Sequence, residues 1–102
     1  TLEYCNNYPE LGAIYLTSGG ITGVASALEI AEKTQQIKVI CHDITTDTVP
    51  LLKKGVVDFA LGQSPVLQGY QLVKTLFEYL VKNICPPDNI EIPITIATDE
   101  SL

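Results

Sequence analysis

The chain has 102 residues, of which 46% are hydrophobic, and it carries a formal net charge of -6. This length suits one small domain, and the apolar content is sufficient for a packed core. Only six residues are lysine or arginine and they form no basic run, so the chain lacks the clustered cations that replace phosphate counterions on a nucleic-acid surface. No apolar stretch approaches the roughly 20 residues of a membrane span. We therefore expect a soluble segment that binds neither DNA nor membrane and carries no targeting signal.

Three cysteines, Cys5, Cys41 and Cys85, stand at wide spacings without a C-x-x-C pair. An odd number at such spacings favours neither a disulfide framework nor a zinc site. Cys41 lies inside an apolar run, where we expect it to act as a small buried hydrophobe rather than as a nucleophile. Unpaired cysteines favour a reducing compartment, so a cytoplasmic location is expected.

The N-terminal part predicts the end of a helix, a strand and a second helix. Residues 1–8 have the pattern of the last turns of a helix that stops before Pro9. Residues 11–16 are predicted to form the first strand, followed by a turn at 17–20. From Ile21 onwards, apolar residues recur at steps of three and four, which predicts an amphipathic helix.

The central part predicts strand, helix and strand. Residues 37–43 are an apolar, β-branched run that ends on Asp43, and residues 56–63 are a second run that ends on Gln63. The segment between them offers several N-cap residues for a short helix, with Pro50 in its first turn. Parallel strands joined by a right-handed helical crossover bring their carboxyl ends to one sheet edge, where open α/β sheets bind ligands. Asp43 and Gln63 should therefore be neighbours in space.

The C-terminal part predicts a long helix and an edge strand. Ser64 as cap and Pro65 at the first position begin a helix that continues to about Asn83. Its apolar residues leave only a narrow polar strip, so burial on more than one side is expected. Residues 90–96 alternate as an edge strand, which can tolerate Pro93. Together the elements predict an α/β fold with an open, mostly parallel sheet and flanking helices.

Three consecutive predicted strands are followed by, or end on, a polar residue: Thr17, Asp43 and Gln63. A carboxylate accepts hydrogen bonds from vicinal hydroxyls and an amide both donates and accepts, which suits a neutral polyol or sugar. Thr17 and Ser18 also precede two glycines and a helix N-terminus, a setting for an anion or a hydroxylated ligand. Taken alone, this loop favours a tight strand-to-helix turn over a ligand site, whereas Asp43 is equally consistent with a helix cap or turn residue.

The sequence contains no recognisable catalytic or cofactor motif. There is no Ser–His–acid set, no G-x-S-x-G, no P-loop lysine and no carboxylate pair with separate acid and base roles. His42 has no second ligand at metal spacing, so it is interpreted as a structural residue or as one that supports the binding residues. We expect no enzymatic activity, no metal and no cofactor.

Three stretches carry a family resemblance: A-I-Y-L-T-S-G-G-I-T-G-V-A-S-A-L, V-I-C-H-D, and L-L-K-K-G-V-V-D-F-A-L-G-Q-S-P with Q-G-Y shortly after. Over nearly the whole chain they resemble the second half of the type 1 periplasmic-binding-protein fold, a Rossmann-like half. Within that fold they look most like the effector domains of lactose-repressor-type (LacI/GalR) transcriptional regulators. The resemblance implies that Asp43 and Gln63 hydrogen-bond the hydroxyls of a ligand. The family often places Asn where Thr17 or Ser18 stands here.

The resemblance also implies an arrangement of domains. Residues 1–102 would be the C-terminal lobe of an effector-binding domain, without the partner lobe and without the DNA-binding headpiece. A sugar-like effector would bind between two lobes, DNA only through the absent N-terminal domain, and the protein would be a homodimer. Helix 65–83 would pack on the other lobe, so in this chain alone we expect it to fold back on its own sheet or to be buried in a dimer.

Two alternatives stay open. A periplasmic sugar-binding protein of a transporter shares the fold, although the unpaired cysteines favour the cytoplasmic regulator. A flavodoxin-like phosphate-binding enzyme or receiver domain would use the Gly19-Gly20 loop to hold phosphate, but the sequence offers it no acidic cluster or lysine partner.

Overall fold

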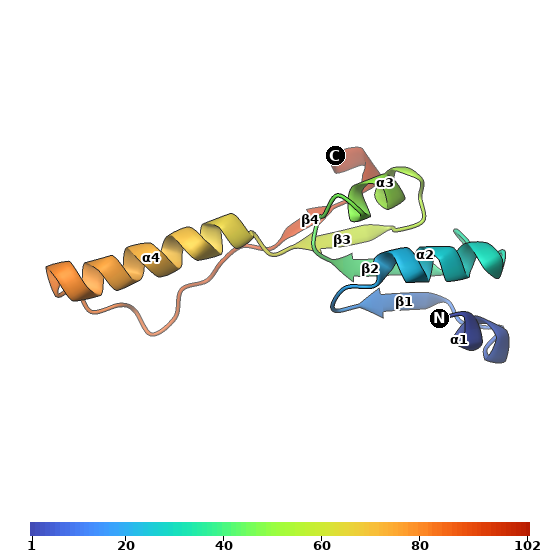
Figure 1. Cartoon of the computed structure of the whole chain (residues 1–102), viewed down its shortest axis with the longest axis horizontal. Coiled ribbons are helices and arrows are strands. Elements are labelled where there is room, and N and C mark those ends of the chain that lie inside the picture. Colours follow the sequence, from blue (N-terminus) through green and yellow to red (C-terminus); the bar gives the residue numbers. More distant parts are fainter. The chain divides into compact units, whose positions relative to one another are not determined.

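The computed structural model describes all of residues 1–102 and divides them into two compact units. Unit 1 consists of Thr1–Gly62 and Ile96–Leu102, and unit 2 of Gln63–Thr95. Unit 1 holds three helices and the sheet, and unit 2 holds one long helix and the extended segment after it (Figure 1).

Unit 1 alternates helices and strands along the chain. Its elements are α1 (Leu2–Asn7), β1 (Ala13–Leu16), α2 (Ile21–Ile30), β2 (Lys38–His42), α3 (Thr48–Lys53), β3 (Phe59–Gly62), β4 (Thr95–Ala97, whose first residue belongs to unit 2) and the 3-10 helix η1 (Asp99–Ser101). Each of the first three predicted strands is confirmed in place, with shorter bounds. Helix α2 ends at Ile30, and positive φ angles at Glu32 and Gln35 follow in the connection to β2.

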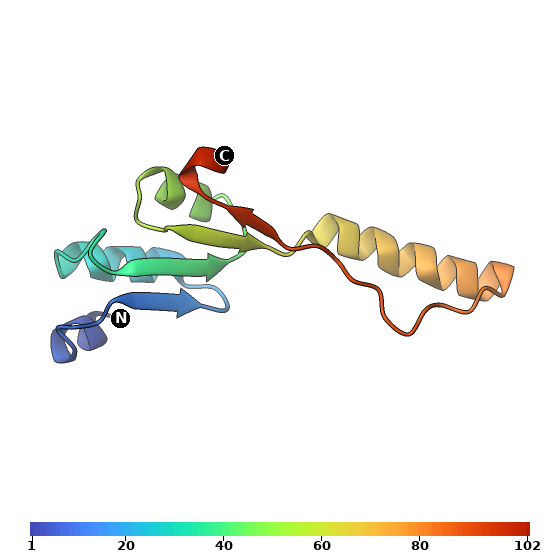
Figure 2. The ribbon, with the colours of Figure 1, turned by 180° about the vertical axis from the view of Figure 1, so that it is seen from behind.

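The four strands lie in the order β1-β2-β3-β4. β1 pairs with β2 and β2 with β3 in parallel, while the chain runs back along β4 in the opposite direction (Figure 2). The prediction of an open, mostly parallel sheet with flanking helices is confirmed.

The core lies between one face of this sheet and the helices of unit 1. Strand β2 buries Val39 and Cys41 on alternate positions, as the two-residue period of a strand requires. The buried apolar residues are Cys5, Val24, Leu28, Ile37, Val39, Cys41, Leu52, Val57, Ala60 and Ala97. The opposite face carries the row Tyr15, Ile40 and Phe59, of which the two aromatic residues are exposed.

Strand β4 is shorter than the sequence predicts. The edge strand expected over residues 90–96 begins only at Thr95. Pro93 has no N–H to donate to a neighbouring strand, and β3 is only four residues long. Alternation alone was therefore a misleading signal for residues 90–94.

Helix α4 (Pro65–Lys82) lies in unit 2 and confirms the predicted helix, while burial in a dimer stays a prediction. None of its residues is buried, and Leu72 and Leu80 are 72% and 65% exposed. Ser64 occupies the N-cap position as predicted, yet its side chain makes no capping bond and donates instead to Pro93 O at 3.2 Å. The capping role predicted for its hydroxyl is wrong, because Ser64 has a left-handed backbone, with φ 51°, rather than the extended conformation typical of a capping residue.

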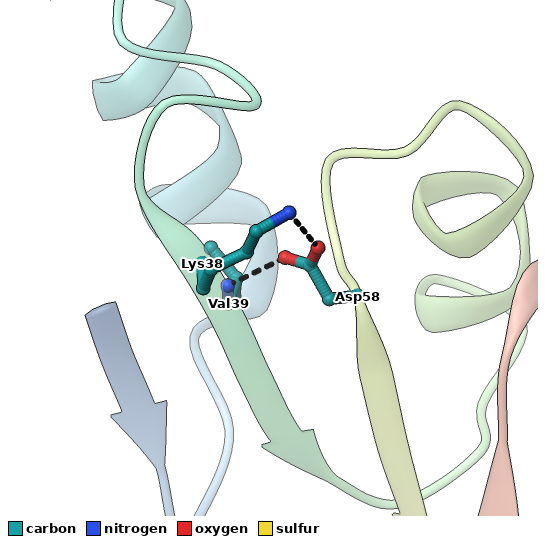
Figure 3. A network of polar contacts seen from close by, with 3 residues as sticks. All are labelled: Lys38, Val39 and Asp58. Atoms are coloured by element: carbon teal, nitrogen blue, oxygen red, sulfur yellow. Dashed lines mark hydrogen bonds and ion pairs between the residues drawn. The ribbon is translucent and has the colours of Figure 1, made fainter. Parts of the chain in front are cut away.

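Asp58, the residue before β3, bridges to β2 through both carboxylate oxygens (Figure 3). Oδ2 accepts the Val39 N–H at 2.9 Å, and Oδ1 accepts the Lys38 ammonium at 2.8 Å. The N–H of Asp58 donates to Val39 O at 2.9 Å. These bonds extend the β2–β3 pairing by one residue and help to set its register.

The two bonds of the Asp58 carboxylate should contribute different amounts to the free energy of unfolding. Asp58→Ala is expected to lower the free energy of unfolding by about 1–3 kcal/mol, because the partly buried Val39 N–H loses its partner. Lys38→Met should cost less than about 1 kcal/mol, since the Lys38 side chain is 63% exposed. Urea unfolding of both variants is the measurement, and equal losses would contradict this division.

Candidate functional site

The carboxyl ends of β1, β2 and β3 lie at one edge of the sheet, because the three strands are parallel (Figure 2). Thr17 follows β1, Asp43 follows β2 and Gln63 follows β3. The parallel pairing predicted for the strands that lead to Asp43 and Gln63 is thus confirmed. Thr17, Asp43 and Gln63 come directly after strands that end at this edge, and Ser18 follows Thr17.

Asp43 has a left-handed backbone conformation, with φ 70°. Its N–H donates to Leu61 O on β3 at 2.9 Å, and its carbonyl oxygen accepts the Thr48 hydroxyl at 3.0 Å. Residues other than glycine rarely adopt this conformation, and aspartate is among those that tolerate it best. Asp43 is therefore a turn residue whose backbone is hydrogen-bonded on both sides of its Cα.

The alternative interpretation of Asp43 as a helix cap is wrong. Helix α3 begins at Thr48, and Asp47 holds the N-cap position without a capping side-chain bond. The side chain that accepts a hydrogen bond from the first turn of α3 is Thr45, whose Oγ1 accepts the Thr48 N–H at 3.2 Å. The carboxylate of Asp43 is thus not needed to begin α3.

Thr48 is the buried polar residue of the core, with 1% of its surface exposed. Its Oγ1 donates to Asp43 O and lies 2.9 Å from Thr45 Oγ1. A hydroxyl has only one proton, so the Thr45 hydroxyl donates to Thr48 in the second contact. Sequence reasoning found Thr48 only as one of several cap candidates, because a threonine at a helix start gives no signal of a tertiary hydrogen bond.

Thr17 and Ser18 lie in the turn between β1 and α2, and both are exposed. Gly20 ends this turn with φ 104° and forms the N-cap of α2 without a side-chain cap. The turn interpretation of residues 17–20 is confirmed. It leaves two hydroxyls and the first N–H groups of a ten-residue helix at the carboxyl end of β1.

Tyr15 and His42 join β1 to β2 on the sheet face opposite the core. The Tyr15 hydroxyl is hydrogen-bonded to His42 Nε2, and the two ring centroids are 5.5 Å apart. His42 directly precedes Asp43, and Tyr15 lies two residues before Thr17. This contact agrees with the structural interpretation of His42.

The three cysteines are free, and they differ in exposure. Cys41 is 1% exposed, as predicted for a small buried hydrophobe. Burial raises the pKa of its thiol, the nearby Asp43 carboxylate raises it further, and hydrogen bonding with Thr48 acts in the opposite direction. Cys41 is therefore a neutral thiol at pH 7. Cys5 is buried and Cys85 is exposed.

Other features of the chain bear on its function. No three side chains among His, Cys, Asp and Glu come together in a way that could hold a metal ion. No helix has the length and apolarity to cross a membrane.

A groove of about 560 Å³ lies within unit 2, and its lining, which includes Leu72, Leu76 and Tyr79, contains none of the predicted binding residues.

A family model described as a periplasmic binding protein domain matches residues 1–83. A search of curated proteins finds no match. Several solved structures share the fold. GanP, a glucose-galactose binding protein from Geobacillus stearothermophilus, aligns with a TM-score of 0.88 and 25% identity over 98% of this chain and 36% of its own.

Two further structures belong to different functional classes. An ABC transporter solute binding protein from Agrobacterium vitis, bound with α-D-tagatopyranose, has a TM-score of 0.84 and 27% identity over 97% of this chain and 34% of its own. A protein described as a LacI transcriptional regulator, from Bacteroides fragilis, has a TM-score of 0.83 and 24% identity over 96% and 34%. The chain spans about a third of the length of each of these structures.

Thiol labelling tests the environment of Cys41. At neutral pH a thiol reagent should modify Cys85 rapidly in the folded protein, whereas Cys41 should react only after unfolding, because it is buried and protonated. Mass spectrometry of labelled peptides gives the sites, and Cys85→Ser provides the control in which rapid labelling disappears. Rapid modification of Cys41 in the folded Cys85→Ser variant would contradict the assignment.

Proposed function

Because the chain belongs to the periplasmic binding protein domain family, we propose that it binds a sugar at the carboxyl edge of its sheet and catalyses no reaction. The observation that carries the proposal is Asp43, a residue at the end of β2 whose N–H donates to Leu61 O on β3 and whose carbonyl accepts the Thr48 hydroxyl on α3. Support comes from relatives at 25% and 27% identity, one a glucose-galactose binding protein and one solved with a tagatose. These relatives are described as binding proteins.

Each proposed binding residue has a chemical role that suits a polyol. The Asp43 carboxylate would accept hydrogen bonds from two adjacent sugar hydroxyls. The hydroxyls of Thr17 and Ser18, exposed at the end of β1, would donate and accept at a neighbouring position. Gln63, the residue after β3, would add an amide that both donates and accepts. A neutral ligand needs no cation from the protein, and none of these four residues is one.

The finer assignment concerns the longer protein. In it, residues 1–102 would be the C-terminal lobe of an effector-binding domain, and ligand contact with both lobes would favour a closed arrangement. We propose that this protein is a cytoplasmic, homodimeric LacI-type regulator whose DNA contacts come from another domain. The free, unpaired cysteines support this choice.

A transporter's solute-binding protein is the second candidate, and the Agrobacterium vitis structure favours it. The gene sequence upstream of Thr1 separates the two. A helix-turn-helix followed by a first lobe would support the regulator, and a secretory signal peptide would support the transporter protein.

Sugar binding is tested on the full-length protein by thermal stabilisation with a panel of aldoses and ketoses, followed by calorimetric titration of the best ligand. Asp43→Asn should weaken binding by about tenfold or more, because charge-assisted hydrogen bonds are lost. Asparagine also tolerates the left-handed backbone, so the free energy of unfolding should change little.

Glu29→Gln is the matched control, since it removes the same charge from an exposed position on α2. Its affinity should equal that of the wild type. Equal affinity of Asp43→Asn and wild type would contradict the assigned role. Stabilisation by Mg²⁺ and phosphate, but by no sugar, would support the phosphate-binding alternative instead.

A further inference from the structure

We propose that Thr48 is a positioning residue that aims the Asp43 carboxylate at the ligand. This inference rests on the proposed function, because it concerns the geometry of the same binding residue. Thr48 itself touches no ligand in the proposal, since it is buried with 1% of its surface exposed. Its effect is transmitted through the backbone of Asp43.

The first step of the argument concerns the direction of the Asp43 side chain. The direction of its Cα–Cβ bond is fixed once the peptide groups before and after its Cα are fixed, and this bond sets the starting point from which the χ rotamers place the carboxylate. The N–H of Asp43 donates to Leu61 O at 2.9 Å, which holds the preceding peptide group. The carbonyl of Asp43 accepts the Thr48 hydroxyl at 3.0 Å, which holds the following one.

The second step concerns the cost of this conformation. A left-handed φ of 70° is less favourable for aspartate than a strand or helix conformation. Such a conformation persists where the surrounding structure determines it. The hydrogen bond to Leu61 continues the strand pairing, so it fixes the peptide group that joins Asp43 to β2. The Thr48 hydroxyl fixes the peptide group on the other side of Asp43, where the chain leaves the sheet.

The third step shows that Thr48 is rigid enough for this role. It is the first residue of α3, and its N–H donates to Thr45 Oγ1 at 3.2 Å. Its Oγ1 accepts the Thr45 hydroxyl at 2.9 Å, so its own proton is left for Asp43 O. With Cys41 a neutral thiol, these bonds leave the Thr48 proton to the carbonyl of Asp43.

The test compares two substitutions in the full-length protein. Thr48→Val keeps the shape of the buried side chain and removes the hydroxyl, and Thr48→Ser keeps the hydroxyl. With the sugar that gives the largest thermal stabilisation, Thr48→Val should weaken binding by about fivefold or more, whereas Thr48→Ser should stay within about twofold of the wild type. Calorimetric titration provides both affinities.

Two controls separate positioning from a loss of stability. Val24→Ala removes buried volume from α2, so it should lower the free energy of unfolding without changing sugar affinity. Amide hydrogen exchange supplies a readout without ligand: the Asp43 N–H should exchange about tenfold faster in Thr48→Val, while the Val39 N–H, bonded to Asp58, should not change.

The outcomes are distinct. If Asp43→Asn binds sugar weakly but Thr48→Val binds as tightly as the wild type, the proposed function stands and this inference is wrong. Equal weakening by Thr48→Val and Val24→Ala would also overturn it, because stability alone would then explain the effect. If no sugar binds, or if Asp43→Asn binds normally, the proposed function fails and this inference fails with it.

Discussion

The parallel pairing of β2 with β3 is the constraint on which the candidate site depends. Its register, Ile40 with Phe59 and His42 with Leu61, places the end of both strands at the same edge and on the same level. A slip of one residue would turn every side chain of the moved strand to the other face, exposing Val39 and Cys41 and burying their neighbours. Asp58 reinforces this register at the amino end through Val39, and the Asp43 N–H reinforces it at the carboxyl end through Leu61. Hydrogen bonds thus fix the β2–β3 pairing at both of its ends, and Asp43, the proposed ligand-binding residue, makes one of them.

Thr48 connects this edge to the core. It is buried, yet its hydroxyl and its N–H are both hydrogen-bonded, so burying these groups carries little desolvation cost. The same region keeps Cys41 neutral, because burial and the Asp43 carboxylate both raise the pKa of its thiol. A neutral thiol adds no like charge near Asp43.

Local sequence signals predicted most of the elements. Strands β2 and β3 follow from apolar, β-branched runs, their parallel order from the helical crossover between them, and helix α4 from Pro65 and the apolar residues after it. The interactions made by single side chains could not be obtained in this way. The Ser64 hydroxyl bonds Pro93 O instead of its own helix, Thr45 rather than Asp47 satisfies the start of α3, and β4 begins only at Thr95. Each depends on residues brought together by the fold. The apolar surface of α4 predicted burial, but none of its residues is buried in this chain.

Gly20 and Asp43, which follow β1 and β2, both have a left-handed backbone, and they meet this requirement in different ways. Gly20, with φ 104°, ends the turn after β1. An added Cβ would meet nothing within 4 Å, so the backbone angle, rather than a lack of space, explains why a glycine stands at this position. Asp43, with φ 70°, follows β2, and a glycine there would be equally suited to the backbone. A glycine, however, would have no group to offer a ligand, and an alanine would meet neither requirement. Aspartate and asparagine are the residues that tolerate this conformation while carrying a polar side chain. The choice of aspartate at position 43, together with a buried threonine that donates to its carbonyl, therefore fits both the left-handed turn and the proposed contact with a ligand.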